Sequence, residues 1–391
     1  MSDDDDDDFD VEYGPHEEPI FPLDTRTSQL LRVIREQRDN FWRPDFGKFF
    51  WRTDGAYFDG RFGSVEWNSV DYRNWKLMVI LSCREIPETV WSQECLQSSL
   101  LVLIIWRCST FLFRLPSSLG ALAALCILEI DRCNRLGTLP DSIGGLKALH
   151  TLRISNCSML TNLSNSLGKL TALCHLHIQE CPLLTTLPES VYCLTALRVL
   201  SGVFCPAFGC LPESIGHLQA LQILNIQCPI SEIPSLGGTV RFRLPDSLGR
   251  LGALEALHIS DLHFICPEAE IPESIGNLSR LKVLEISSRR LTRLPDSIGR
   301  LSALCVLNLK CDRVEVLPDT LCQLDRLEVF FLSPLSHALH HVPPFVKHGP
   351  ADVLLWFGRR YAPPKLLLLV LAARTLHANH LSDECWVQLL D

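Results

Sequence analysis

The sequence lacks both a long apolar run and an apolar start. Its longest aliphatic stretches, Leu100–Trp106 and Leu366–Ala373, are far shorter than the about 18 residues that indicate a membrane-spanning helix. The first ten residues, MSDDDDDDFD, contain no apolar segment of the kind that a secretory signal carries. Together these absences predict a chain with no membrane span and no export signal.

Signature motifs of catalysis are also missing. The chain has no GxxxxGKS/T phosphate-binding loop, no HExxH metal motif and no GxSxG nucleophile elbow. Its cysteines and histidines stand in no recognisable nucleophilic setting. We therefore predict that the protein is not an enzyme, with no catalytic residues and no cofactor. The opposing hypothesis is an enzyme in which a Cys and a His side chain come together only in the folded protein. Such an enzyme would show turnover that disappears when one of these residues is substituted while the fold is kept.

The 17 cysteines include no C-x-x-C pair and are spread along the chain, unlike those of small secreted scaffolds. With no export signal, this distribution favours a reducing compartment, and we predict a cytoplasmic location. Four histidines lie close together in the sequence near the C-terminus, at His337, His340, His341 and His348. They have neither a neighbouring cysteine pair nor regular ligand spacing, so we predict no metal site.

The formal net charge of −9 is unevenly distributed. Residues 1–24 hold eleven acids and no Lys or Arg, which leaves 34 acids against 36 bases in the rest of the chain. A nearly neutral body offers no broad basic surface, so we expect no nucleic-acid partner. Residues 1–24 are predicted to be a disordered acidic tail. Docking of that tail onto a basic partner, or onto the rest of the chain, remains an alternative.

One pattern recurs through the middle of the chain, and the stretch from Leu139 to Ile154 reads LPDSIGGLKALHTLRI. Prolines of the same local pattern stand at positions 116, 140, 188, 212, 245, 272, 295 and 318, with Ser164 in the place of a missing one. The steps between them are 24, 24, 24, 24, 33, 27, 23 and 23 residues. Such a period is typical of a solenoid, in which each unit is too small to fold alone and neighbours bury its apolar edge.

This pattern resembles the leucine-rich repeat family over roughly residues 86–332. Its LPxSIGxLxxLxxLxI form resembles cytoplasmic repeat proteins of plants and protists, including the repeat region of plant disease-resistance proteins. The resemblance implies an α/β solenoid, a horseshoe with a parallel β-sheet on its concave side. It also implies short helices or 3₁₀ turns on the convex side, and caps at both ends. The nucleotide-binding module that precedes the repeats in the resistance proteins is absent, because the phosphate-binding loop is missing.

Within a unit, we expect Leu149, Leu152 and Ile154 to point inward on or just before a short strand. The step from Pro140 to Ser142 suits the first turn of a short helix, where an acid meets the positive helix end. Gly144 is expected to allow a tight bend. The family usually has Asn after the strand, whereas here that place is taken by cysteines, which we predict to form a buried structural column: Cys108, Cys133, Cys157, Cys181 and Cys205, with Cys228 and Cys311 one residue earlier.

We divide the chain into four segments: a disordered acidic tail at 1–24, an aromatic-rich N-terminal cap at 25–75, the repeat solenoid at 76–332 and a helical C-terminal extension at 333–391. The aromatic segment is alternatively a recognition surface for a peptide. The first two strands are expected at Leu77–Leu81 and Leu100–Ile105. The second of them has apolar side chains on both faces, so we expect both of its faces to be covered. Two apolar helices are expected at Ala351–Tyr361 and Pro364–Asn379.

Alternation along each strand sends every second side chain to the concave face. The residues predicted to bind a partner there are Glu129, Asp131, Arg153, His177, Gln179, Asn225, Gln227, His258, Glu285, Asn308 and Lys310. Nine strands spaced at about 4.8 Å make a face roughly 40 Å long. Such a face can supply the roughly 800 Å² per partner of a standard protein interface.

We therefore predict a recognition or scaffold module that binds a protein partner through its concave face, in intracellular signalling or defence. An alternative follows from the last residues, LSDECWVQLLD, which are loosely similar to the opening of an F-box. In that case the protein is a substrate adaptor of a ubiquitin ligase. Deletion of residues 351–391 separates the two hypotheses, because an adaptor then loses the ligase and keeps its target.

Overall fold

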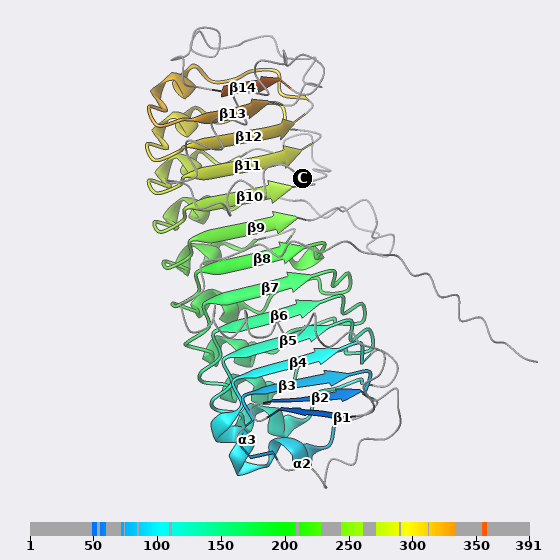
Figure 1. Cartoon of the computed structure of the whole chain (residues 1–391). Coiled ribbons are helices and arrows are strands. Elements are labelled where there is room, and N and C mark those ends of the chain that lie inside the picture. The colour runs from blue at the N-terminus through cyan, green and yellow to red at the C-terminus, as the bar shows by residue number, and fades with distance from the viewer. Residues whose placement is uncertain are drawn as a thin grey trace, which may run out of the picture. The chain divides into compact units, whose positions relative to one another are not determined.

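A β-sheet of 14 strands organises the protein (Figure 1). The structure is a computed structural model, and it describes residues 49–52, 55–59, 72–73, 75–83, 86–108, 112–208, 211–227, 244–260, 271–288, 291–311, 313–332 and 354–357. All of these lie in the compact unit Phe46–Tyr361. Strands that are neighbours in the sheet are also consecutive in the sequence, so each repeat contributes one strand next to the strand of the preceding repeat.

The strands are short and nearly uniform in length. They are β1 (Phe49–Arg52), β2 (Gly55–Asp59), β3 (Leu77–Leu81), β4 (Val102–Trp106), β5 (Ile127–Asp131), β6 (Thr151–Ser155), β7 (His175–Gln179), β8 (Val199–Val203), β9 (Ile223–Gln227), β10 (Ala256–Ser260), β11 (Val283–Ser288), β12 (Val306–Cys311), β13 (Val329–Leu332) and β14 (Leu354–Phe357). Strands β1 and β2 are antiparallel, and every later pair is parallel. This is the parallel sheet that the repeat predicts.

Short turns connect the strands along one side of the sheet (Figure 1). Two are α-helical, α2 (Glu88–Trp91) and α3 (Glu94–Ser99). The others are 3₁₀ turns: η3 (Ser117–Ala121), η4 (Asp141–Gly145), η5 (Asn165–Lys169), η6 (Glu189–Cys193), η7 (Pro206–Phe208), η8 (Glu213–His217), η10 (Asp246–Arg250), η11 (Glu273–Asn277), η12 (Asp296–Arg300) and η13 (Asp319–Gln323). Pro140 directly precedes η4, as expected for a residue whose fixed φ suits the entry to a helical turn.

The core lies between the sheet and the turns. Ile143, Leu149, Leu152 and Ile154 are each 0 % exposed, which confirms the inward positions predicted for this unit. Most buried apolar residues of the described repeats form one continuous cluster from Phe58 to Leu332. Each unit therefore shares its apolar edge with both neighbours, and the described repeats form the α/β solenoid that was predicted.

The repeated glycine has a different role from the one predicted. No left-handed φ occurs at Gly144, so a tight bend is not the reason for glycine there. A Cβ at this position would lie 2.7 Å from the carbonyl oxygen of Ser166 in the next turn, and one at Gly276 would lie 2.4 Å from that of Ser297. Glycine is needed because successive 3₁₀ turns approach each other more closely than any side chain allows.

In several turns an acid in the first turn binds the following repeat. Glu88 accepts hydrogen bonds from the backbone N–H groups of Ser117 (2.8 Å) and Ser118 (2.7 Å). Glu213, in η8, accepts one from Ser247 N–H in η10 at 2.9 Å. From the sequence, this acid was expected to interact with the positive end of its own turn. In the structure, the carboxylate instead accepts hydrogen bonds from the first N–H groups of the next turn, which have no partner within that turn.

Both ends of the sheet extend beyond the predicted strands. Strands β1 and β2 precede β3, so the expectation that Leu77–Leu81 opens the sheet was wrong. Leu354–Phe357 is strand β14, where a helix was expected. These strands could not be found from the repeat, because neither segment follows its pattern. The boundaries of the four predicted segments stay a prediction.

Several predictions lie outside the described residues: the acidic tail, the second C-terminal helix, the four neighbouring histidines and the F-box-like end. Within the part of the chain that is described, no helix has both the length and the apolarity needed to traverse a lipid bilayer.

The glycine contacts lead to a test with a matched control. Gly276→Ala places a Cβ against backbone in the next turn, whereas a Cβ at Gly252 meets nothing within 4 Å. We expect Gly276→Ala to lower the free energy of unfolding by about 1–3 kcal/mol, as other overpacked sites do. Gly252→Ala should leave it unchanged or raise it by about 0.4–1 kcal/mol. Urea denaturation measures both, and equal effects would contradict the close approach of the turns.

The capping carboxylates predict a dependence of stability on pH. Hydrogen bonds from Ser118 and Ser117 lower the pKa of Glu88 to about 2. Because the folded-state pKa lies below the unfolded one, this carboxylate stabilises the fold above about pH 4.5, and the contribution is lost as pH falls toward 2. Glu88→Gln should therefore be less stable than the wild type at pH 6 and indistinguishable from it near pH 2 in urea denaturation. A stability difference that does not change with pH would exclude the cap.

Candidate binding face

The face of the sheet opposite the core carries three parallel rows of side chains, and we call it the outer face. The middle row crosses the strands in register as Glu129, Arg153, His177, Ser201, Asn225, His258, Glu285, Asn308 and Phe331. The end row, two residues later on each strand, contains Asp131, Ser155, Gln179, Val203, Gln227, Ser260, Ser287 and Lys310. Every residue predicted to bind a partner lies in one of these two rows.

A third row, which the sequence reasoning missed, begins each strand and is mostly apolar. This apolar row contains Val102, Ile127, Thr151, His175, Val199, Ile223, Ala256, Val283, Val306 and Val329. Ile127 and Val306 are 2 % and 1 % exposed, yet neither belongs to the described core cluster between the sheet and the turns. Residues i and i+2 of a strand lie on the same face, so counting back two residues from the middle row would have identified this apolar row. Most members of this apolar row are buried, so the accessible part of the outer face consists mainly of the two polar rows.

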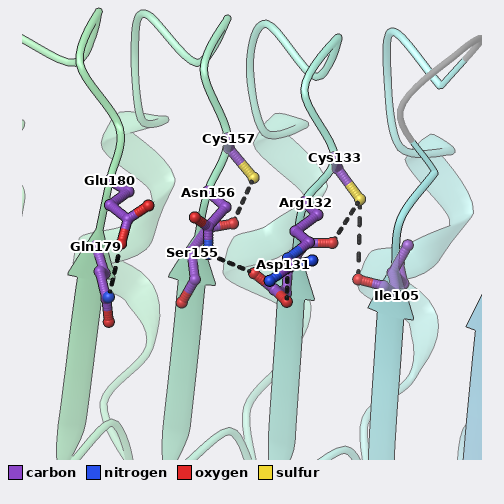
Figure 2. A network of polar contacts seen from close by, with 9 residues as sticks. All are labelled: Ile105, Asp131, Arg132, Cys133, Ser155, Asn156, Cys157, Gln179 and Glu180. Atoms are coloured by element: carbon purple, nitrogen blue, oxygen red, sulfur yellow. Dashed lines mark hydrogen bonds and ion pairs between the residues drawn. The ribbon is translucent and has the colours of Figure 1, made fainter. Parts of the chain in front are cut away.

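Polar contacts lie at the ends of strands β5 to β7, where one joins the ends of β5 and β6 and a separate pair lies at the end of β7 (Figure 2). Asn156 Nδ2 donates a hydrogen bond to Asp131 Oδ1 at 2.9 Å, and Arg132 Nε lies 3.9 Å from Asp131 Oδ2. Further along, Gln179 Nε2 donates to Glu180 Oε1 at 3.0 Å. The sequence reasoning named Asp131 and Gln179 but missed the three residues that follow the strands.

The missed residues share an uncommon backbone conformation. Arg132, Asn156 and Glu180 have left-handed φ values of 53°, 54° and 49°. The same conformation occurs at the corresponding position of neighbouring repeats, at Ser82, Arg107 and Phe204. Non-glycine residues adopt it seldom, and a single sequence gives no signal for it apart from its place before the buried cysteine. It turns the chain at each strand end and sets these side chains in a row (Figure 2).

Beneath this network lies the predicted cysteine column. Cys133 Sγ donates to the carbonyl oxygens of Asp131 (3.6 Å) and Ile105 (3.8 Å), and Cys157 Sγ donates to that of Ser155 (3.3 Å). The neighbouring thiol of Cys108, together with burial, raises the pKa of Cys133 far above its ordinary value, so this thiol stays protonated. Among the described residues, no group of three Cys, His, Asp or Glu side chains is arranged to hold a metal ion.

A second polar cluster lies on the outer face of strands β10 to β12. Glu285 is 9 % exposed and accepts three contacts: from His258 Nδ1 at 3.2 Å, Asn308 Nδ2 at 3.0 Å and Lys310 Nζ at 2.9 Å. Burial opposes ionisation of this carboxyl, but the bonds from His258 and Lys310 hold the pKa of Glu285 below its ordinary value. Four of the predicted residues are therefore assembled around one buried carboxylate.

Strand β7 carries two histidines on the outer face, His175 and His177. Burial, with Arg153 and His175 nearby, holds the pKa of His177 well below its ordinary value, so its ring is neutral at pH 7. His175 itself contacts Thr151 Oγ1 at 3.4 Å. The predicted residues thus do not form one cluster. Asp131 and Gln179 make contacts at the strand ends, whereas His258, Glu285, Asn308 and Lys310 form an ion-pair cluster several repeats away.

Comparison with known proteins supports the repeat. Residues 98–260 match the family model described as a leucine-rich repeat region. The comparison with curated proteins finds no match.

Among solved structures, the chain is similar to the leucine-rich repeat domain of the type III effector XCV3220 (XopL), at 24 % identity and a TM-score of 0.46, covering 71 % of this chain and 81 % of that one. It is also similar to an internalin (inlF) from Listeria monocytogenes, at 14 % identity and a TM-score of 0.47, covering 73 % and 82 %. These likenesses concern the repeat fold and name no ligand for the present chain.

The strand-end network predicts that Asp131 destabilises the fold at neutral pH. Burial raises the pKa of Asp131 above its ordinary value, although Asn156 donates a hydrogen bond to it. A raised folded-state pKa means that the contribution of this carboxyl to stability is present at low pH and is lost as pH rises through the folded pKa. Asp131→Asn should therefore be at least as stable as the wild type at pH 7, with a smaller difference at pH 3.5.

Urea denaturation at the two pH values measures this difference. Asp325→Asn is the control, because that side chain is exposed on the connection between η13 and β13. If Asp131→Asn proved clearly less stable than the wild type at pH 7, the burial argument would be wrong.

Proposed function

We propose, from the match of residues 98–260 to a leucine-rich repeat region, that the chain is a non-enzymatic recognition or scaffold module that binds another protein through its outer face. The observation that carries this proposal is the make-up of that face. Two rows of polar and charged side chains, most of them partly exposed, run across strands that are hydrogen-bonded to each other. Such an arrangement of polar and charged groups is what gives a protein interface its specificity.

The dimensions of the outer face support the same function. Strands β4 to β13, at about 4.8 Å each, extend over roughly 40 Å, which is enough for a standard interface of about 800 Å² per partner. The side chains stand on one continuous sheet and several are already fixed by neighbours, as Glu285 is by His258 and Lys310. Preorganised side chains lose little conformational freedom on binding, which favours affinity.

The cysteine chemistry and the repeat form support the proposed place of action. The Cys133 and Cys157 thiols act as hydrogen-bond donors in the interior, which suits a reducing compartment. Together with the resemblance to cytoplasmic repeat proteins of plants and protists, this supports a role in the cytoplasm, in signalling or defence. The ubiquitin-ligase adaptor alternative rests on the sequence of the C-terminal residues alone.

Reversal of charge on the middle row tests the proposal. A variant carrying Arg153→Glu, His177→Glu and His258→Glu places three new carboxylates across the outer face, where a partner would have to bury them. We expect recovery of the partner in an affinity pull-down from cell extract to fall at least tenfold, with the unfolding temperature measured alongside to exclude loss of the fold.

Arg280→Glu with Arg300→Glu is the matched control. Both side chains are exposed beside the turns η11 and η12, on the other side of the core from the outer face. Unchanged partner recovery by the middle-row variant, or equal loss in the control, would remove the outer face as the binding surface.

A further inference from the structure

A group of arginines lies where strands β4 and β5 end. Arg107 and Arg132 each follow directly on their strand, and the backbone N–H of Arg107 donates to the carbonyl oxygen of Asp131 in the next repeat at 2.9 Å. Arg114 and Arg135 stand further along the connections to the next turns. We call these four side chains the arginine cluster. Arg107, Arg114 and Arg135 are exposed and Arg132 is partly exposed, so solvent and a binding partner reach the cluster.

The connections that carry the cluster contain no acid. They read RCSTFLFRLP over residues 107–116 and RCNRLGTLP over residues 132–140. The corresponding segment of the next repeat, residues 156–163, holds neither an acid nor a base. One carboxylate at the strand ends, that of Asp131, lies 3.9 Å from the Arg132 guanidinium. Positive charge is therefore concentrated in two adjacent repeats of a body whose charges are otherwise nearly balanced.

Aromatic rings hold two of the guanidinium groups in place. That of Arg107 lies 5.2 Å from the centre of the Trp106 ring, and that of Arg135 lies 5.6 Å from the centre of the Phe113 ring. A guanidinium that rests on a ring keeps its N–H donors at its edge, where a carboxylate can accept from them. Side chains that are held before binding lose less conformational freedom when the partner arrives.

The chemistry and the extent of the cluster point to a short acidic segment. The planar fork of arginine N–H donors matches the paired oxygens of a carboxylate. One strand spacing and three residues of chain separate Arg107 from Arg135, at most about 15 Å, which about five extended residues cover. A nucleic acid strand needs positive charge along its length. Here the arginines stop after two repeats, and Glu129 and Asp131 border them on the outer face.

The arginine cluster is continuous with the outer face. Trp106 lies in register with Asp131 in the end row, and Arg107 and Arg132 are the next residues of the chain. We propose that the arginine cluster binds a short Asp- or Glu-rich segment of the protein partner through its guanidinium groups. This inference rests on the proposed function and deepens it, because it names the chemistry of one part of the partner and the place where that part binds.

The test removes three charges without adding new ones. The triple variant carries Arg107→Gln, Arg114→Gln and Arg135→Gln, all at exposed positions, so the buried core is untouched. The control makes the same change at three exposed arginines beside the turns η11 to η13: Arg280→Gln, Arg300→Gln and Arg326→Gln. Thermal unfolding of both variants verifies that they keep the fold of the wild type.

The probe is a fluorescein-labelled peptide of twelve residues in which Glu alternates with Ser, titrated with the full chain at low salt and followed by fluorescence anisotropy. Its Kd should rise at least tenfold for the triple variant and stay unchanged for the control. Added salt should weaken the binding, since exposed charges are screened. Equal loss in the control, or equal binding of a peptide with Gln in place of Glu, would overturn the cluster as the site.

Other occupants are distinguished by further probes. A phosphoserine peptide of the same length, or a single-stranded thymidine oligonucleotide, might be expected at any group of arginines. If either binds the cluster at least tenfold more tightly than the Glu peptide, phosphate is the ligand and the carboxylate assignment is overturned. If the Glu peptide binds only after deletion of residues 2–8, the run of Asp in this chain is the occupant, and the assignment to a partner is overturned.

Partner recovery separates this inference from the proposed function. The triple variant should recover at least threefold less partner than the wild type in the affinity pull-down. If it recovers as much as the wild type while the charge-reversed middle-row variant loses the partner, the outer face still binds protein and only the arginine cluster fails. If neither variant loses the partner, the proposed function fails as well.

Discussion

The structure depends on the stacking of one short repeat on the next at the spacing of parallel strands. No unit closes a core of its own, so each feature of the repeat serves the contact with its neighbour. Leu152 and Ile154 bury the shared apolar edge. Gly144 permits the close approach of the turns, and Glu88 caps the turn that follows it. The outer face is a consequence, because every stacked strand presents its alternate residues there.

The sequence predicted the fold because the pattern is copied many times. One unit with Leu149, Leu152 and Ile154 in place would be weak evidence, but nine copies leave a solenoid as the natural interpretation. The roles of Gly144 and of the first-turn acids were not predictable in the same way, since both are contacts between repeats and the period alone does not give their geometry. Strand β14 was missed because its segment does not follow the repeat.

The candidate site was predicted in part. Alternation placed Glu285, Asn308 and Lys310 on the same face, but the bonds between them join residues more than 20 positions apart and follow only from the register of the strands. The left-handed conformation of Asn156 depends on the turn after the strand, and no period in the sequence reports it. The sequence therefore predicted the face of the sheet on which these side chains lie. It did not predict which residues they form hydrogen bonds and ion pairs with.

The central claim is that the outer face, and not the turn side, holds the partner. Hydroxyl-radical footprinting of the full chain, with and without the captured partner, tests it most directly. The account predicts that labelling falls at outer-face side chains such as His258 and Phe331 and is unchanged at the turns η10 to η13. Protection confined to the turns, with the outer face labelled as in the free protein, would contradict it.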